Sequence, residues 1–157
     1  MLLIGGLPAH ILLVHAVVVF GPLAGLSAVT YGLAGRTRRY LAWPLGALAL
    51  ILAPLALVTA SAGEQLQSTR GATDAIQAHA RQGDILKVTA VVFFFLVLLM
   101  LAATFTPLAS RIPALASLQR SRPARTAALA LGVLAGLFVI YQSVITGHSG
   151  SFSVWGG

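Results

Sequence analysis

The sequence contains no cysteine, and this absence excludes several kinds of site. Without thiols the chain has no disulfides, no thiolate metal ligands and no cysteine for covalent attachment of haem. Any metal site would therefore have to use imidazole or carboxylate groups.

Charged residues are scarce too: they make up 8% of the chain, and only three of them are acidic. Soluble domains contain roughly 25% charged residues. Hydrophobic residues make up 58%, and the mean hydropathy is +0.93. This composition is typical of an integral membrane protein, and 157 residues leave nothing for a soluble domain.

Four apolar stretches are long enough to cross a bilayer, which takes about 20 helical residues. They cover about residues 7–33, 40–62, 85–108 and 126–146. We therefore predict one all-α transmembrane domain over residues 1–157, an integral membrane four-helix bundle in the lipid bilayer. The first stretch is too long for a signal peptide and lacks a basic leader, so we expect it to be retained.

The basic residues predict how the chain is oriented. The first loop carries Arg36, Arg38 and Arg39, and the third carries Arg111, Arg120, Arg122 and Arg125. Arginine-rich loops stay in the cytoplasm, so both termini and the 63–84 segment are expected on the outer face of a bacterial inner membrane. The basic residues of the cytoplasmic loops account for the net charge of +7. The positive charge therefore does not indicate nucleic-acid binding, and we expect no nucleic-acid partner.

Glycine and capping patterns predict several local features. Asp74 and Gln77 resemble a capping box for a short surface helix, which Gly83 would end before Asp84 caps the third span. The segment 146–150 is too rich in glycine to extend the fourth span. Small-residue pairs at Gly21 and Gly25 in the first span, and at Gly132 and Gly136 in the fourth, predict close packing of these two spans, although such pairs also arise by chance in this composition.

All four histidines and all three acids fall at the predicted outer end of the spans. They are His10, His15, Glu64, Asp74, His79, Asp84 and His148. Because ionisable groups near a membrane are costly and usually face the bundle interior, we predict one polar site there. Its expected ligands are His10, His15, His79 and His148 with Glu64, supported by Asp84 and Ser149.

His15 is the strongest single candidate because it lies two turns inside an apolar helix. The alternative is a neutral histidine hydrogen-bonded to another helix. His10 and His15 are five residues apart and differ in direction by roughly 140°, so they are expected to have different partners.

Three kinds of function remain open for this cluster. The first expectation is a b-type haem protein that takes part in electron transfer, because a b-type haem needs two axial ligands from opposite sides, and imidazole is a common one. A zinc, copper or iron ion could be bound by histidines and a carboxylate. The third possibility is a proton relay, or a cluster that is purely structural. The sequence has no phosphate-binding loop, nucleophile elbow or dinucleotide motif.

Several segments resemble a known family: Leu7-Pro8-Ala9-His10, Leu13-Val14-His15-Ala16, Gly63-Glu64, Ala78-His79 and Gly147-His148-Ser149-Gly150. They are similar to the bacterial four-helix membrane proteins grouped as domain of unknown function 2231, over almost the whole chain. Ile11 replaces a proline in that family's His-Pro-Leu-Leu-Val-His pattern. Some members look joined to Rieske-type or cytochrome-type domains. The resemblance therefore implies electron transfer with a periplasmic or membrane redox partner, and it leaves a homo-oligomer open.

Overall fold

The chain folds into four long helices, as the hydropathy pattern predicts. The structure is a computed structural model that describes residues 3–4, 6–70, 73–107, 112 and 114–155. The long helices are α1 (Ala9–Leu33), α2 (Arg38–Arg70), α3 (Asp74–Thr104) and α6 (Arg122–Trp155). All four are long and apolar enough to cross a membrane, so the chain has the architecture of a multi-pass membrane protein.

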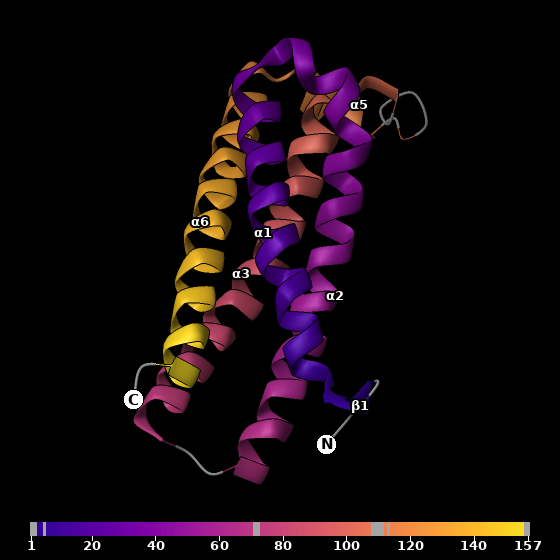
Figure 1. Cartoon of the computed structure of the whole chain (residues 1–157). Coiled ribbons are helices and arrows are strands. Elements are labelled where there is room, and N and C mark those ends of the chain that lie inside the picture. The colour runs from indigo at the N-terminus through magenta and orange to yellow at the C-terminus, as the bar shows by residue number, and fades with distance from the viewer. Residues whose placement is uncertain (1–2, 5, 71–72, 108–111, 113, 156–157) are drawn as a thin grey trace.

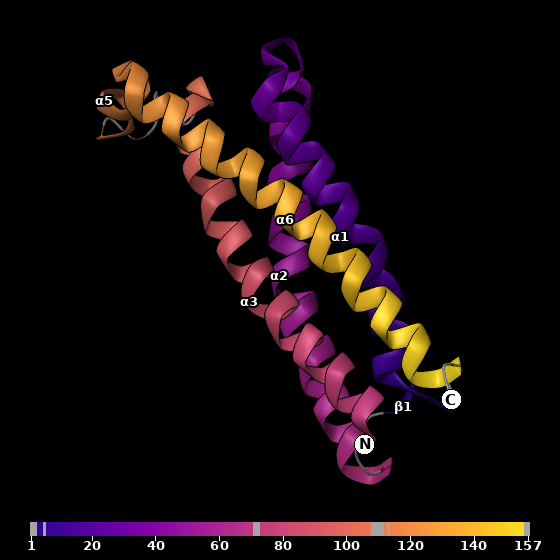
Figure 2. The same ribbon diagram turned by 90° about the vertical axis from the view of Figure 1, so that its left-hand side faces the viewer.

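The four helices form a closed ring in the order α1, α2, α3, α6. Each packs mainly on its two neighbours, so α1 lies diagonally opposite α3, and α2 opposite α6. Figure 1 shows both termini and the α2–α3 connection at one end of the bundle, which we call the histidine end. Residues 34–39, with the short helix η1 (Gly35–Thr37), and helix α5 (Ala114–Arg120) lie at the other end, called here the arginine end. In Figure 2 the bundle is turned so that α6 faces the viewer.

A small hairpin precedes the bundle at the histidine end. Strands β1 (Leu3–Ile4) and β2 (Leu7–Pro8) pair antiparallel, and Gly6 turns the chain with a φ of 83°, which glycine adopts without strain. Helix α1 then begins at Ala9, just before His10, with Pro8 as its N-cap.

Two predicted helix ends at the histidine end are wrong. Helix α3 runs without a break from Asp74 through Gly83 and Asp84, and its N-cap is Thr73, whose side chain accepts a hydrogen bond from the Ile76 amide. Helix α6 continues through the glycine-rich segment 146–150 to Trp155. These extensions persist because each packs on a neighbouring helix, and such tertiary contact outweighs the roughly 1 kcal/mol cost of a helical glycine.

Close packing of α1 on α6, by contrast, is confirmed. A Cβ on Gly25 would lie 2.5 Å from the Gly136 carbonyl oxygen, and a Cβ on Gly136 would lie 2.7 Å from the Gly25 carbonyl oxygen. Both positions must be glycine for the backbones to approach this closely. One turn away, Gly21 faces Ser143, whose buried hydroxyl has no hydrogen-bond partner in the described part of the chain.

The middle of the bundle is filled by apolar side chains from all four helices. The largest fully buried ones include Leu45, Leu52, Phe93, Val97 and Met100. Four of the buried polar side chains among the described residues, Thr59, Gln142, Ser143 and Thr146, lie nearer the histidine end, and Thr89 lies at the middle of α3.

Hydrogen bonds close the arginine end. Arg38 donates to the carbonyl oxygens of Tyr31 and Gly32, which satisfies the last turn of α1. The hydroxyl of Tyr31 pairs with Thr104 of α3 at 2.9 Å. Gln119 of α5 caps the end of α3 in the same way, through the carbonyl oxygens of Ala102 and Phe105. Arg111 lies outside the described residues.

Candidate functional site

Two of the four histidines meet inside the bundle. His10 comes from the first turn of α1 and His79 from the second turn of α3, and their ring centres lie 6.1 Å apart with the planes at 70°. Because α1 and α3 are diagonal helices, the two imidazoles meet across the centre of the bundle. Both are half-buried.

The ring of His10 is held by α2. Its Nδ1 lies 2.9 Å from the Thr59 carbonyl oxygen. A carbonyl oxygen only accepts, so Nδ1 carries the hydrogen and donates it. In the neutral ring Nε2 then has a free lone pair, the arrangement found in metal-ligating histidines that donate their other N–H to a carbonyl.

The ring of His79 is held by α6 in an equivalent way. Its Nδ1 lies 3.0 Å from Ser149 Oγ. The Ser149 hydroxyl donates its own hydrogen to the Thr146 carbonyl oxygen at 2.9 Å, so it accepts from His79 Nδ1. Nε2 of His79 is therefore the second nitrogen left for a ligand. The sequence predicted Ser149 as a supporting residue of this site, and the structure places it there.

Each imidazole rests against a glycine. A Cβ on Gly63 would lie 2.9 Å from Cε1 of His10, and a Cβ on Gly150 would lie 3.0 Å from Cε1 of His79. Any larger residue at either position would push the ring away from its hydrogen-bond acceptor. These glycines belong to the segments that the sequence pattern marked as Gly63-Glu64 and Gly147–Gly150, but the contact with the rings could not be read from the spacing.

An amide pair fixes α3 to α6 beside His79. The side chain of Gln142 is buried, and its Nε2 donates to Gln82 Oε1 at 2.8 Å and to the Gln82 carbonyl oxygen at 3.2 Å. Thr146 donates to the same carbonyl oxygen at 3.3 Å. These bonds set the register in which Ser149 reaches His79. Sequence reasoning missed Gln142, although an isolated glutamine in an apolar span is a signal that could have identified it.

A small cavity lies against both rings. It has a volume of about 40 Å³ and is lined by His10, His79, Thr59, Thr146 and Lys87, together with apolar residues of α1, α2 and α3. A cavity needs about 10–15 Å³ of such volume to hold one water molecule. This cavity therefore accommodates a single ion together with a few water molecules.

Lys87 connects this cavity to the surface. Its ammonium lies 2.7 Å from Asp84 Oδ1 and 3.7 Å from Glu64 Oε1. Both carboxylates are largely exposed, so Glu64 and Asp84 hold Lys87 and make no contact with the imidazoles. The sequence predicts Glu64 as a ligand and Asp84 as a supporting residue, but a carbonyl oxygen and a hydroxyl group bond the Nδ1 atoms of the two histidines.

The other two histidines do not join the site. His15 is exposed, and its Nδ1 bonds to the Ile11 carbonyl oxygen of its own helix. His148 is also exposed. The prediction that His15 faces the bundle interior is wrong because His10 takes the inward direction, and a residue five positions later on a regular helix points elsewhere. The side chain of Trp155 lies outside what the structure describes.

The site has only two ligands to offer a metal. Among the described residues, no group of three or more histidine, cysteine, aspartate or glutamate side chains is placed to hold a metal ion. Metal–imidazole bonds are about 2.0–2.1 Å long. The ring centres of His10 and His79 lie 6.1 Å apart, which leaves room for one metal atom to contact both rings.

A porphyrin does not fit the space between the rings as the bundle stands. Sites for small molecules and cofactors have volumes of roughly 300–1,000 Å³, and this cavity has about 40 Å³. The two imidazoles suit the axial positions of a haem, but α1 and α3 would have to move apart to admit the ring.

Comparisons with protein families, curated proteins and solved structures found no match. The resemblance to domain of unknown function 2231 therefore stays a prediction.

Proposed function

We propose that this protein is a membrane-bound redox protein that holds one transition metal between Nε2 of His10 and Nε2 of His79. The observation that carries the proposal is the pair of neighbouring imidazoles, each bonded through Nδ1 to a different helix. Copper and iron both bind imidazole and both change oxidation state, whereas zinc does not. Electron transfer is therefore the function that this donor pair supports best.

The cavity volume favours a bare copper or iron ion. A space of about 40 Å³ holds one ion, with water supplying the ligands that the protein does not. This reverses the order expected from the sequence, which placed haem first.

A b-type haem remains the second candidate, and the number of ligands favours it. Haem iron brings four nitrogens of its own and needs two axial ligands. The structure offers two histidines at one place and no third ligand among the described residues. For this candidate, His10 and His79 would hold the iron, while Thr59 and Ser149 would orient their rings.

A proton path across the membrane has less support. The buried side chains in the described middle of the bundle, such as Leu52, Phe93 and Val97, are apolar. The polar groups near His10 and His79 therefore have access from one end of the bundle. That suits a site that exchanges electrons or a ligand at one face.

We further propose that the histidine end faces outward from a bacterial inner membrane. Arg36 and Arg39 are exposed at the opposite end, together with Arg120, Arg122 and Arg125. A concentration of arginine marks the cytoplasmic side. A periplasmic or membrane-bound redox partner would then meet the protein at the His10–His79 end.

Absorption spectroscopy and elemental analysis of the same sample test this function. The full chain would be expressed with ample haem, copper and iron and purified in detergent. An absorption band that corresponds to about one haem per chain supports the haem candidate. Bound copper or iron without that band supports the bare ion. Protein that retains neither, in any of these preparations, overturns the proposed function.

A further inference from the structure

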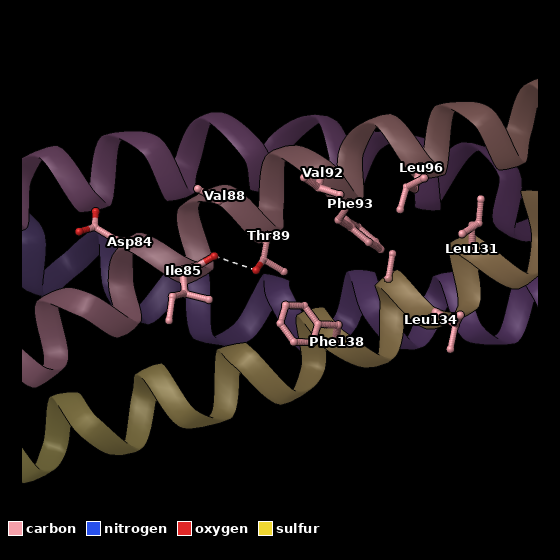
Figure 3. A pocket seen from close by; sticks show the side chains of 11 residues that line it. Asp84, Ile85, Val88, Thr89, Val92, Phe93, Leu96, Leu131, Leu134 and Phe138 are labelled. Carbon is pink, nitrogen blue, oxygen red and sulfur yellow. Dashed lines mark hydrogen bonds between the residues drawn. The ribbon is translucent and has the colours of Figure 1, made fainter.

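A second cavity, separate from the histidine site, lies between α3 and α6. It is a groove with a volume of about 670 Å³. Figure 3 shows it running from Asp84 to Leu96 along α3, with Leu131, Leu134 and Phe138 on the α6 side. Its volume is that of a typical small-molecule site.

The wall of the groove is apolar over most of its length. Several lining side chains are widely exposed, including Val88 at 59%, Val92 at 50% and Leu134 at 62%. The hydroxyl of Thr89 donates to the Ile85 carbonyl oxygen of its own helix at 2.7 Å, so it offers no free donor to an occupant (Figure 3). Such a surface in a membrane-spanning segment fits hydrocarbon.

The length of the groove matches one leaflet of a bilayer. Twelve residues separate Asp84 from Leu96, which corresponds to about 18 Å at 1.5 Å per residue. Half of a hydrocarbon core of about 30 Å is about 15 Å. A lipid of the leaflet at the histidine end would therefore place its tail in the groove and its head near Asp84.

The charges at that end select the head group. Asp84 and Glu64 share the single ammonium of Lys87, which leaves one excess negative charge. Arg81 is exposed and lies three residues before Asp84, on the same side of α3. A head that carries both an ammonium and a phosphate complements Asp84 and Arg81 together, whereas an anionic head without an ammonium has a partner only in Arg81.

We propose that this groove binds one zwitterionic phospholipid with a primary ammonium head, of the phosphatidylethanolamine class. The acyl chain lies between α3 and α6, the ammonium pairs with Asp84, and the phosphate pairs with Arg81. The proposal does not depend on the metal site.

Native mass spectrometry of the full chain tests it, with phosphatidylethanolamine and phosphatidylglycerol of identical acyl chains as competing probes. An exposed ion pair contributes up to about 1 kcal/mol, so we expect about a fivefold preference for phosphatidylethanolamine. Asp84→Asn should remove this preference and keep lipid binding. The control is Asp74→Asn, because Asp74 is an exposed acid at the start of the same helix. This change should leave the preference for phosphatidylethanolamine unchanged.

A bulky residue in the groove separates tail binding from head binding. Val92→Trp should reduce retention of both lipids, while Val19→Trp, the same change on the exposed face of α1, should not. Equal retention of the two lipids by the wild type overturns the proposal, as does full retention by Val92→Trp. A disulfide between Leu134→Cys chains in the bilayer would also overturn it, because a second copy would then cover the groove.

Discussion

A methyl group on Gly63 would lie 2.9 Å from Cε1 and 3.0 Å from Nδ1 of His10, so the imidazole occupies the space that any side chain at position 63 would need. The ring lies directly on the backbone of α2, and this is how Nδ1 reaches the Thr59 carbonyl oxygen one turn earlier. The absence of a side chain at position 63 is therefore what allows the imidazole of His10 to lie against α2.

Gly63→Ala should therefore displace His10 without harming the helix. Alanine favours helix more than glycine does, so the helix content should stay the same. Loss of the Nδ1 bond should weaken metal binding by about tenfold or more, as loss of such supporting contacts does. Metal content per chain and circular dichroism measure the two effects.

The matched control is Gly46→Ala on the same helix, where a Cβ meets only Leu101 Cδ1 at an ordinary 3.5 Å. It should keep its metal. If Gly63→Ala binds metal as well as Gly46→Ala does, the described role of Gly63 is wrong.

Ser149→Ala should weaken metal binding through His79. It removes the hydroxyl that accepts from Nδ1, so the ring loses its hydrogen bond to Ser149, and the expected loss of affinity is about 10- to 100-fold. Ser151→Ala is the control, because Ser151 bonds only to the His148 carbonyl oxygen on the exposed side of the same helix. Metal titrations of both variants should differ; equal affinities would contradict the assignment of Ser149.

Gly25→Ala and Gly136→Ala should each destabilise the bundle. The added methyl group meets a carbonyl oxygen of the facing helix at 2.5 or 2.7 Å, and backbone cannot move aside as a side chain can. Forcing atoms into a packed interior costs about 1–3 kcal/mol. Unfolding in mixed detergent measures the change, and a variant as stable as Gly46→Ala would contradict the close approach of α1 and α6.

Much of the fold could be predicted from the sequence because hydropathy reports directly on membrane spans. The four apolar stretches follow from it. The close packing of the first and fourth spans follows from the small-residue pairs at Gly21 and Gly25 and at Gly132 and Gly136. The helix ends at the histidine end could not be predicted in this way. The residues around Gly83 and Gly150 are polar or small, and they are helical because neighbouring helices pack on them, which no local pattern records.

The candidate site was only partly predictable for a similar reason. Clustering at one end identified His10 and His79 as candidates, but it also included His148, and the depth of His15 in its span ranked that histidine first. Which histidine points inward depends on the rotation of each helix about its axis, and packing sets that rotation. The sequence did not single out Lys87 and Gln142, because Glu64 and Gln82, which they contact, lie more than 20 residues away in the chain.

Labelling of single cysteines should establish the orientation, and the absence of native cysteine makes this straightforward. In right-side-out membrane vesicles, an impermeant maleimide should react with Ser151→Cys and fail to react with Gly35→Cys until the membrane is opened. Both positions are exposed in the structure. The reverse pattern would contradict the orientation inferred from the arginine residues.

X-ray absorption spectroscopy of the bound metal tests the central claim most directly, because it counts imidazole ligands. The wild type and His15→Ala should each show two imidazoles on one metal atom, at about 2.0–2.1 Å. His10→Ala and His79→Ala should each lose one imidazole or the metal itself. Two imidazoles that persist in His10→Ala or His79→Ala, or that disappear in His15→Ala, would contradict the assignment of this pair.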